Sequence, residues 1–188
     1  MRVFDTEIPD VKIIEPTVYA DKRGYFFEVY NAQKFEKLMS FCPSFCQSNE
    51  SFSKKGTIRG LHLQKEPYAQ SKLVRVISGT VLDVAVDCRV GSNSFGQYVA
   101  VELSSKNNHQ LWIPKGFAHG FQVLSETCIL NYQVDSPYNS EAEVSINVFD
   151  TFINIKWRPS DGIIMKESDR NASQFFDAMS YQLSGSQL

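Results

Sequence analysis

The sequence predicts an all-β protein, a sandwich or barrel built from many short strands. From residue 56 onward, apolar runs follow one another at short spacing and are separated by turns rich in Gly, Pro and Asn. The 14 Phe and 8 Tyr residues also favour strands. A chain of 188 residues with 43% apolar residues is long enough to bury a core, and we expect a single domain over residues 1–188.

The first fifty residues mix strand and helix signals. Pro16 cannot donate a hydrogen bond within a sheet, so the strand that contains it should lie at an edge. Asn31 is a good cap for the first helix. The elements predicted here are an exposed edge strand at 12–20, a turn at 21–24, an aromatic strand at 25–30, a helix at 31–39 and an extended segment at 45–51.

The remaining chain is predicted to form consecutive strands followed by one more helix. The predicted strands are 57–64, 72–78, 80–88, 97–103, 110–113, 117–124, 127–135 and 144–148. The second helix is predicted at 168–179, and residues 184–188 should be loose.

Charge and cysteine content limit the classes of partner and compartment. A net charge of −2 gives no reason to expect nucleic-acid or membrane binding. The N-terminal residues contain no apolar signal core, and no run approaches membrane-spanning length. The cysteines lack a zinc spacing and three of the four sit among apolar residues, which predicts buried thiols in a reducing cytoplasm; they are Cys42, Cys46, Cys88 and Cys128.

A histidine in the predicted strand 57–64 is the first candidate for chemistry. Successive side chains of a strand point to opposite faces, so Leu61 and Leu63 share one face. Ile58, Gly60 and His62 should share the other. The glycine either leaves room beside the imidazole or marks a bulge. Taken alone, His62 is more often a core histidine bonded to a backbone carbonyl.

Three more polar side chains fall on apolar strand faces, the faces that a barrel turns inward. They are Lys72, His119 and Tyr132. A buried lysine is costly because desolvation penalises its charge. Each residue alone could be explained by snorkelling or a buried hydrogen bond. Together with His62 they predict a site.

The histidine spacing argues against a metal at this site. His62 and His119 are far apart in the sequence, position 64 is Gln, and the third histidine, His109, lies in a polar turn. Scattered histidines do not make the clustered ligand set that a metal needs. We therefore expect a metal-free site.

The same residues suit proton transfer. His62 is a natural base near neutral pH, and Tyr132, whose type titrates near a pKa of about 10, is a natural acid. Lys72 could stabilise an enolate that forms between them. Asp169 is a possible carboxylate to orient the histidine, although its spacing alone favours helix capping.

Several long motifs, in order over nearly the whole chain, resemble the dTDP-4-dehydrorhamnose 3,5-epimerase family. The motifs are Arg23-Gly24-Tyr25-Phe26-Phe27-Glu28, Gln47-Ser48-Asn49-Glu50-Ser51, Arg59-Gly60-Leu61-His62, Lys72-Leu73-Val74-Arg75, Val84-Ala85-Val86-Asp87 and Trp112-Ile113-Pro114-Lys115-Gly116-Phe117-Ala118-His119-Gly120-Phe121.

The resemblance implies a metal-free, cofactor-independent jelly roll of the cupin type that acts as a homodimer on a dTDP-4-keto-6-deoxyhexose in dTDP-L-rhamnose biosynthesis. It implies that His62 is the base, Asp169 its orienting partner and Tyr132 the acid, with Lys72 beside the keto oxygen. It also implies a nucleotide-sugar site formed by Arg23, Phe26, Glu28, Gln47, Asn49, Arg59, His119, Tyr138 and Glu143, with Arg23 to Glu28 reaching the neighbouring subunit.

Two departures from the family pattern leave the number of inverted carbons open. Pro137 stands where the family often has a tyrosine, and Ser168 stands where a lysine commonly precedes the aspartate. The alternatives are an epimerase that inverts only one carbon and a related barrel that moves the ketone. A non-catalytic sugar-nucleotide-binding barrel is a third alternative, since it needs no base and acid.

Overall fold

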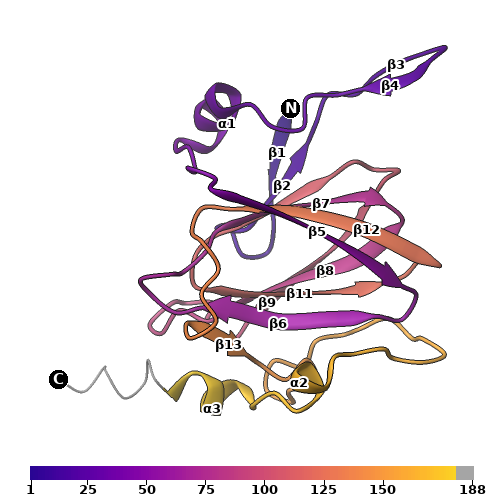
Figure 1. Ribbon diagram of the computed structural model, residues 1–188. Helices are drawn as coiled ribbons and strands as arrows, with labels where there is room; N and C mark the ends of the chain where they lie inside the picture. The colour runs from indigo at the N-terminus through magenta and orange to yellow at the C-terminus, as the bar shows by residue number, and fades with distance from the viewer. Residues whose placement is uncertain (181–188) are drawn as a thin grey trace.

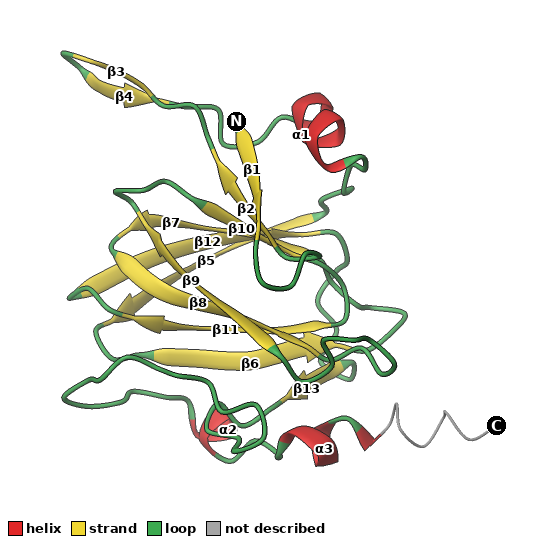
Figure 2. Ribbon diagram, turned by 180° about the vertical axis from the view of Figure 1, so that it is seen from behind, coloured by secondary structure: helices red, strands yellow, loops and turns green. Residues whose placement is uncertain are grey.

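Two antiparallel sheets pack face to face in the computed structural model, which describes residues 1–180 (Figures 1 and 2). The six-stranded sheet has the order β1 (Arg2–Asp5), β2 (Lys12–Glu15), β10 (Gln110–Ile113), β7 (Lys72–Ser78), β12 (Thr127–Val134) and β5 (Gln47–Lys54). The five-stranded sheet has the order β13 (Glu143–Ser145), β6 (Ile58–Gln64), β11 (Phe117–Val123), β8 (Thr80–Asp87) and β9 (Tyr98–Ser104). This confirms the predicted all-β sandwich.

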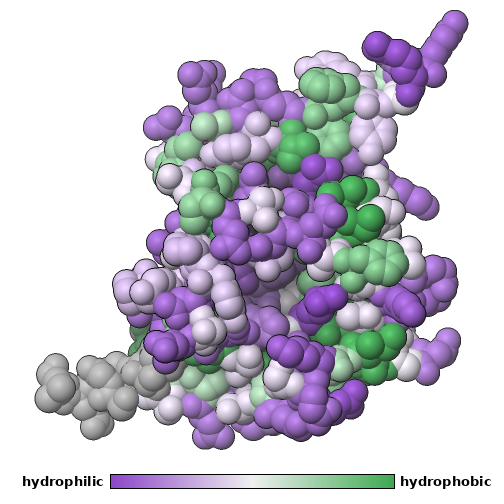
Figure 3. All heavy atoms as spheres, viewed as in Figure 1, coloured by the Kyte–Doolittle hydropathy of each residue, from purple (hydrophilic) through white to green (hydrophobic). Residues whose placement is uncertain are grey.

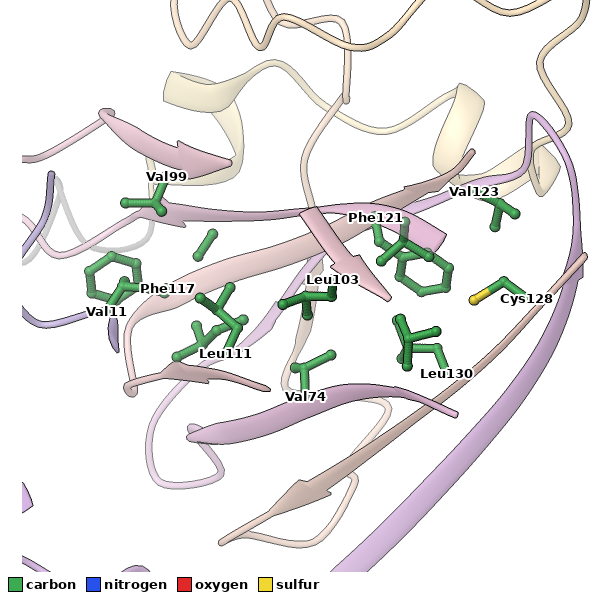
Figure 4. Close-up of a cluster of buried hydrophobic side chains, with 14 of the residues drawn as sticks. Val11, Val74, Val99, Leu103, Leu111, Phe117, Phe121, Val123, Cys128 and Leu130 are labelled. Carbon is green, nitrogen blue, oxygen red and sulfur yellow. The ribbon is translucent and has the colours of Figure 1, made fainter. Parts of the chain in front are cut away.

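The main core lies between the two sheets, where alternate side chains of each strand meet (Figure 4). Val74 and Leu130 of the six-stranded sheet are fully buried in the same cluster as Phe117 and Phe121 of the five-stranded sheet. The outer face of the five-stranded sheet is covered by the chain after β13, including α2 (Glu167–Arg170) and α3 (Phe175–Ala178) (Figure 1).

The first helix forms as predicted. In α1 (Ala32–Met39), the Asn31 side chain accepts a hydrogen bond from the Lys34 backbone N–H at 3.1 Å, which satisfies a free donor of the first turn. Phe35 is the buried residue of the helix, and its ring centroid lies 5.5 Å from that of Trp112. This contact covers the outer face of the six-stranded sheet beside β10.

The N-terminal strands differ from the prediction. The segment 12–20 is not one edge strand: β2 ends at Glu15, before Pro16, and lies between β1 and β10 inside the sheet. After Pro16 the chain forms a separate hairpin of β3 (Tyr19–Asp21) and β4 (Gly24–Phe26), which projects from the body (Figure 1). The aromatic strand expected at 25–30 therefore ends at Phe26.

The prediction of one helix at 168–179 is also wrong, because the chain forms two helices of four residues each. Between them, the Ser173 carbonyl accepts a hydrogen bond at 2.9 Å from the backbone N–H of Asn147, in a bridge between two extended segments. That contact holds Ser173 outside the helical conformation. The predicted tail at 184–188 lies outside the described residues.

The cysteines of the described chain are free thiols, and two of them are buried. Cys88 and Cys128 lie in the core, whereas Cys42 and Cys46 are exposed. The prediction of three buried thiols is therefore wrong for one of them. No helix within residues 1–180 is long and apolar enough to cross a membrane.

Candidate active site

A pocket of about 750 Å³ opens between β5, the edge strand of one sheet, and β6 of the other. This side of the molecule faces the viewer in Figures 1 and 3, and its surface around β5 is mostly hydrophilic. Both sheets contribute to the lining. Of the predicted site residues, the pocket wall contains Asn49, Arg59, His62, Lys72, His119, Tyr132 and Asp169.

A bulge in β6 turns its polar side chains into the pocket. His62 pairs with His119 and Arg59 with Phe121, so β6 has one more residue than β11 over this span. Ile58 consequently packs in the same cluster as Leu61, on the outer side of the sheet, and not on the face of His62. The predicted alternation was wrong for Ile58, and the alternative that Gly60 marks a bulge is confirmed.

Gly60 is required at this bulge for two reasons. Its φ of +118° is rarely adopted by residues with a side chain. A Cβ at this position would lie 2.6 Å from the Gly120 Cα and 2.7 Å from the His119 carbonyl oxygen. The close approach of the two backbones therefore fixes where His62 enters the pocket.

Asp169 orients the imidazole of His62. The His62 Nε2 lies 2.9 Å from Asp169 Oδ1, and the Gly60 backbone N–H donates to Asp169 Oδ2 at 3.3 Å. Burial raises the pKa of Asp169, but these hydrogen bonds outweigh it and hold that pKa below its usual value. The ionised carboxylate keeps the proton on Nε2, which leaves the lone pair on Nδ1.

The capping interpretation of Asp169 is wrong. The cap position of α2 is Lys166, and Asp169 is the third residue of the helix. Its side chain is buried and bonds to β6, which is far away in the sequence. The short helix thus places the Asp169 carboxylate in the pocket wall.

The sheet opposite His62 contributes Tyr132 on β12 and Lys72 on β7 to the pocket wall. Lys72 is buried, and its Nζ lies 5.8 Å from the centroid of the Tyr132 ring. Burial lowers the pKa of Lys72 to about 8, against the opposing attraction of Asp83 and Glu143. Burial raises the pKa of Tyr132, although its hydrogen bond with Asn49 opposes this. At neutral pH the tyrosine keeps its proton and most of the lysine is charged.

His119, in the pocket wall, forms a second histidine–carboxylate pair. Its Nε2 lies 3.0 Å from both carboxylate oxygens of Asp83, and both residues are buried. Burial lowers the pKa of His119 despite the neighbouring carboxylate. Sequence reasoning missed Asp83, yet it falls on the same strand face as Val81 and Ala85, a carboxylate among inward apolar side chains.

Cationic side chains gather at one end of the pocket. Arg59 of β6 lines the pocket and bonds to β5, with Nε donating to Ser53 Oγ at 3.1 Å and Nη2 to the Phe52 carbonyl at 3.2 Å. Lys54 and Lys166 line the same pocket. Neither lysine was predicted from the sequence. This end suits the negative charge of a diphosphate.

Gln47, Tyr138 and Glu143 form a hydrogen-bonded group beside the pocket, joined to it through Asn49. The Gln47 side chain donates to Asn49 Oδ1 at 2.8 Å and accepts from the Tyr138 backbone N–H at 3.2 Å. The Tyr138 hydroxyl donates to Glu143 Oε2 at 2.5 Å. The Tyr138 ring is 57% exposed, so one face is available for stacking.

Three predicted residues are not brought to this pocket. Arg23 pairs with Asp21 inside the projecting hairpin, Phe26 is 70% exposed, and Glu28 bonds to Lys34 at 2.8 Å. The pocket of the chain therefore assembles without the segment from Arg23 to Glu28.

Proton transfer is the chemistry that this arrangement supports. A base held by a carboxylate lies on one sheet, and a protonated tyrosine and a buried lysine lie on the other. Within residues 1–180, no three His, Cys, Asp or Glu side chains are grouped closely enough to hold a metal ion.

Comparison with known proteins identifies the family. The dTDP-4-dehydrorhamnose 3,5-epimerase family matches residues 5–177. The chain belongs to this family. It is 48% identical to the dTDP-4-dehydrorhamnose 3,5-epimerase of Shigella flexneri, over 95% of this chain and 98% of that one.

Solved structures share the fold of the epimerase. A Legionella pneumophila 3,5-epimerase in complex with dTDP-4-keto-L-rhamnose has a TM-score of 0.90 and 44% identity, covering 93% of this chain and 92% of that one. A 3'-monoepimerase from Streptomyces bikiniensis has a TM-score of 0.88 but only 27% identity, covering 98% and 91%. The fold is common to both activities, whereas the sequence is closer to the 3,5-epimerases.

Proposed function

We propose that the chain inverts carbons 3 and 5 of dTDP-4-keto-6-deoxy-D-glucose, with His62 as base and Tyr132 as acid. The observation that carries this proposal is the placement of the two groups on opposite sheets, with the pocket between them. A sugar ring inserted there has one face toward the base and the other toward the acid. The product would enter dTDP-L-rhamnose formation.

The reaction needs no cofactor, because the 4-keto group acidifies the hydrogens on both neighbouring carbons. The Nδ1 of His62 takes a proton from carbon 3 or carbon 5, and the Asp169 carboxylate stabilises the imidazolium that forms. The electron pair of the broken C–H bond moves onto the keto oxygen as an enolate. The Lys72 ammonium offsets this charge in a buried environment where electrostatic stabilisation is strong.

Return of a proton to the opposite face inverts the carbon. The Tyr132 hydroxyl supplies this proton and takes up another from solvent, while the His62 imidazolium releases its proton to solvent. His119 lies beside Tyr132: its ring centroid is 6.4 Å from that of Tyr132, and Asp83 holds its Nε2. We assign the His119–Asp83 pair to positioning Tyr132 and balancing the charge of Lys72.

Substrate binding follows from the charged and aromatic groups around the pocket. Arg59 binds the diphosphate, and the hydrogen-bonded group of Gln47, Tyr138 and Glu143, joined to the pocket through Asn49, contacts the nucleotide sugar. The cytoplasmic location predicted from the thiols stays a prediction.

Deuterium exchange tests the reaction and its alternatives together. In deuterium oxide, dTDP-4-keto-6-deoxy-D-glucose should gain deuterium at carbons 3 and 5 and yield the doubly inverted product, both visible by proton NMR. Exchange and inversion at one carbon alone would show a monoepimerase. Tight binding without any exchange would show a non-catalytic barrel, and a relocated ketone would show the isomerase alternative.

We propose further that the protein is a homodimer whose pocket is completed by the β3–β4 hairpin of the second copy. The hairpin projects from the body with Tyr19, Tyr25 and Phe26 exposed at 63%, 60% and 70% (Figure 1). Such an apolar projection is costly in water and suits a two-fold interface. It would bring Arg23, Phe26 and Glu28 to the partner's nucleotide.

Light scattering should give about twice the chain mass of 21.4 kDa. Phe26→Asp places a charge on the exposed apolar hairpin, so the protein should shift toward monomer and its KM should rise. Phe149→Asp, at a ring that is 50% exposed but far from the hairpin in the sequence, is the matched control and should leave both unchanged. A monomer with full activity at assay concentration would contradict the proposal.

A further inference from the structure

An unpaired hydroxyl group lies in the wall of the pocket. Ser51 is in β5, and the alternating burial of this strand turns Asn49, Ser51 and Ser53 toward the pocket. The Ser51 Oγ is shielded from solvent and has no hydrogen-bond partner among residues 1–180. Its two neighbours on the same face are both paired. Asn49 accepts from Gln47 at 2.8 Å, and Ser53 accepts from Arg59 at 3.1 Å.

The strand that pairs with β5 offers Ser51 no partner. The residue opposite Ser51 on β12 is Leu130, which is fully buried in the core. A shielded hydroxyl without a partner is unfavourable, and alanine would fill the same space without that cost. A partner that arrives with the bound substrate accounts for a serine at this position.

The position of Ser51 along β5 indicates which substrate group it meets. On one side, Asn49 pairs with Tyr132, the proposed acid. On the other side, Ser53 binds Arg59 at the cationic end of the pocket, which suits the diphosphate. Ser51 therefore lies between the group that protonates the reacting carbons and the group that binds the diphosphate.

In the proposed substrate two ring atoms have this relation, carbon 2 and the ring oxygen, because carbon 1 carries the diphosphate and carbons 3 and 5 are inverted. Of the two, only carbon 2 carries a hydroxyl group. We propose that the Ser51 hydroxyl binds the carbon-2 hydroxyl of the hexose and makes the enzyme selective for 2-hydroxy sugars, an inference that rests on the proposed function. The carbon-3 hydroxyl changes direction during inversion, whereas the carbon-2 hydroxyl keeps its configuration. A fixed contact at carbon 2 holds the ring throughout the reaction. Rotation about χ1 between staggered positions turns the Ser51 oxygen toward the sugar.

A substrate lacking this hydroxyl tests the inference. The parent enzyme and Ser51→Ala are assayed with dTDP-4-keto-6-deoxy-D-glucose and with its 2-deoxy analogue. We expect Ser51→Ala to lose about tenfold in kcat/KM with the 2-hydroxy substrate, the scale of one hydrogen bond, and to change little with the analogue. The parent should prefer the 2-hydroxy substrate by about the same factor.

Two controls separate recognition from structure. Ser48→Ala changes a serine on the outer face of the same strand and should leave kcat/KM unchanged with both substrates. Without substrate, the Tm of Ser51→Ala should equal or exceed that of the parent, because no protein hydrogen bond is lost. A fall in Tm would mean that Ser51 is structural.

Three activity results would overturn the inference. Equal losses with the two substrates would show a general effect on the pocket, and no loss with either would show that Ser51 does not contact the hexose. A parent protein that exchanges deuterium into neither substrate would overturn the proposed function itself, and the Ser51 inference with it.

Discussion

His62→Ala is expected to lower the rate of inversion by about 10²–10⁴-fold, the usual contribution of a general base. The variant lacks the nitrogen that accepts the substrate proton, and it leaves the Asp169 carboxylate buried without its main partner. Because proton removal precedes every later step, deuterium uptake at carbons 3 and 5 should fall by the same factor. NMR in deuterium oxide measures uptake and inversion in one experiment.

The matched control for this variant is His109→Ala. His109 lies directly before β10 in the loop from β9 and is not in the pocket wall, so its loss should leave the rate unchanged. Binding of the substrate to His62→Ala should stay within a few-fold of the parent, since Arg59 and the other binding groups are intact. If His62→Ala kept rapid exchange, another group would be the base, and the assignment would be wrong.

Strand alternation was sufficient to predict most of the inner wall of the pocket. Lys72, His119 and Tyr132 stand out because each is polar on a strand face that is otherwise apolar, and the structure brings all three to one cavity with His62. The same rule could have identified Asp83, which lies between Val81 and Ala85 on an inward face. These positions are predictable because alternation is a local property of each strand.

Contacts that depend on irregular backbone could not be predicted in this way. The bulge at Gly60 shifts Ile58 to the other face, and one inserted residue is enough to reverse the alternation. The bond from His62 to Asp169 joins residues 107 positions apart through a four-residue helix. Lys166 reaches the pocket on the same irregular segment. Local patterns carry no information about how such a segment folds back.

The projecting hairpin shows a different limit to what the sequence can predict. Pro16 was taken as the sign of an edge strand over 12–20, but the strand ends before it at Glu15, and β1 pairs outside β2 and removes it from the edge. The hairpin leaves the aromatic rings of Tyr19, Tyr25 and Phe26 exposed. Sequence patterns describe what a chain buries within itself, and an interface with a second copy is seen only as apolar residues left exposed.

Tyr132→Phe is expected to separate exchange from inversion. The variant keeps the ring that packs against the core and the Lys72 ammonium, and it loses only the hydroxyl. His62 still removes a proton and Lys72 still stabilises the enolate, so deuterium should enter carbons 3 and 5 at a rate within a few-fold of the parent. The deuteron then returns from the face of His62, and the configuration is retained. Inversion should fall by about 10²–10⁴-fold, the usual contribution of a general acid.

Measuring deuterium exchange and inversion separately tests the role of Tyr132 better than measuring a loss of activity. A variant that had merely disturbed the pocket would lose exchange and inversion together, whereas loss of the acid alone separates them. Tyr68→Phe removes a hydroxyl from a tyrosine outside this pocket, and it should change neither rate. If Tyr132→Phe inverted the sugar as fast as the parent, the proton would come from another donor on the same wall. Lys72 is a donor on that wall, and its pKa of about 8 would let it act as an acid near neutral pH.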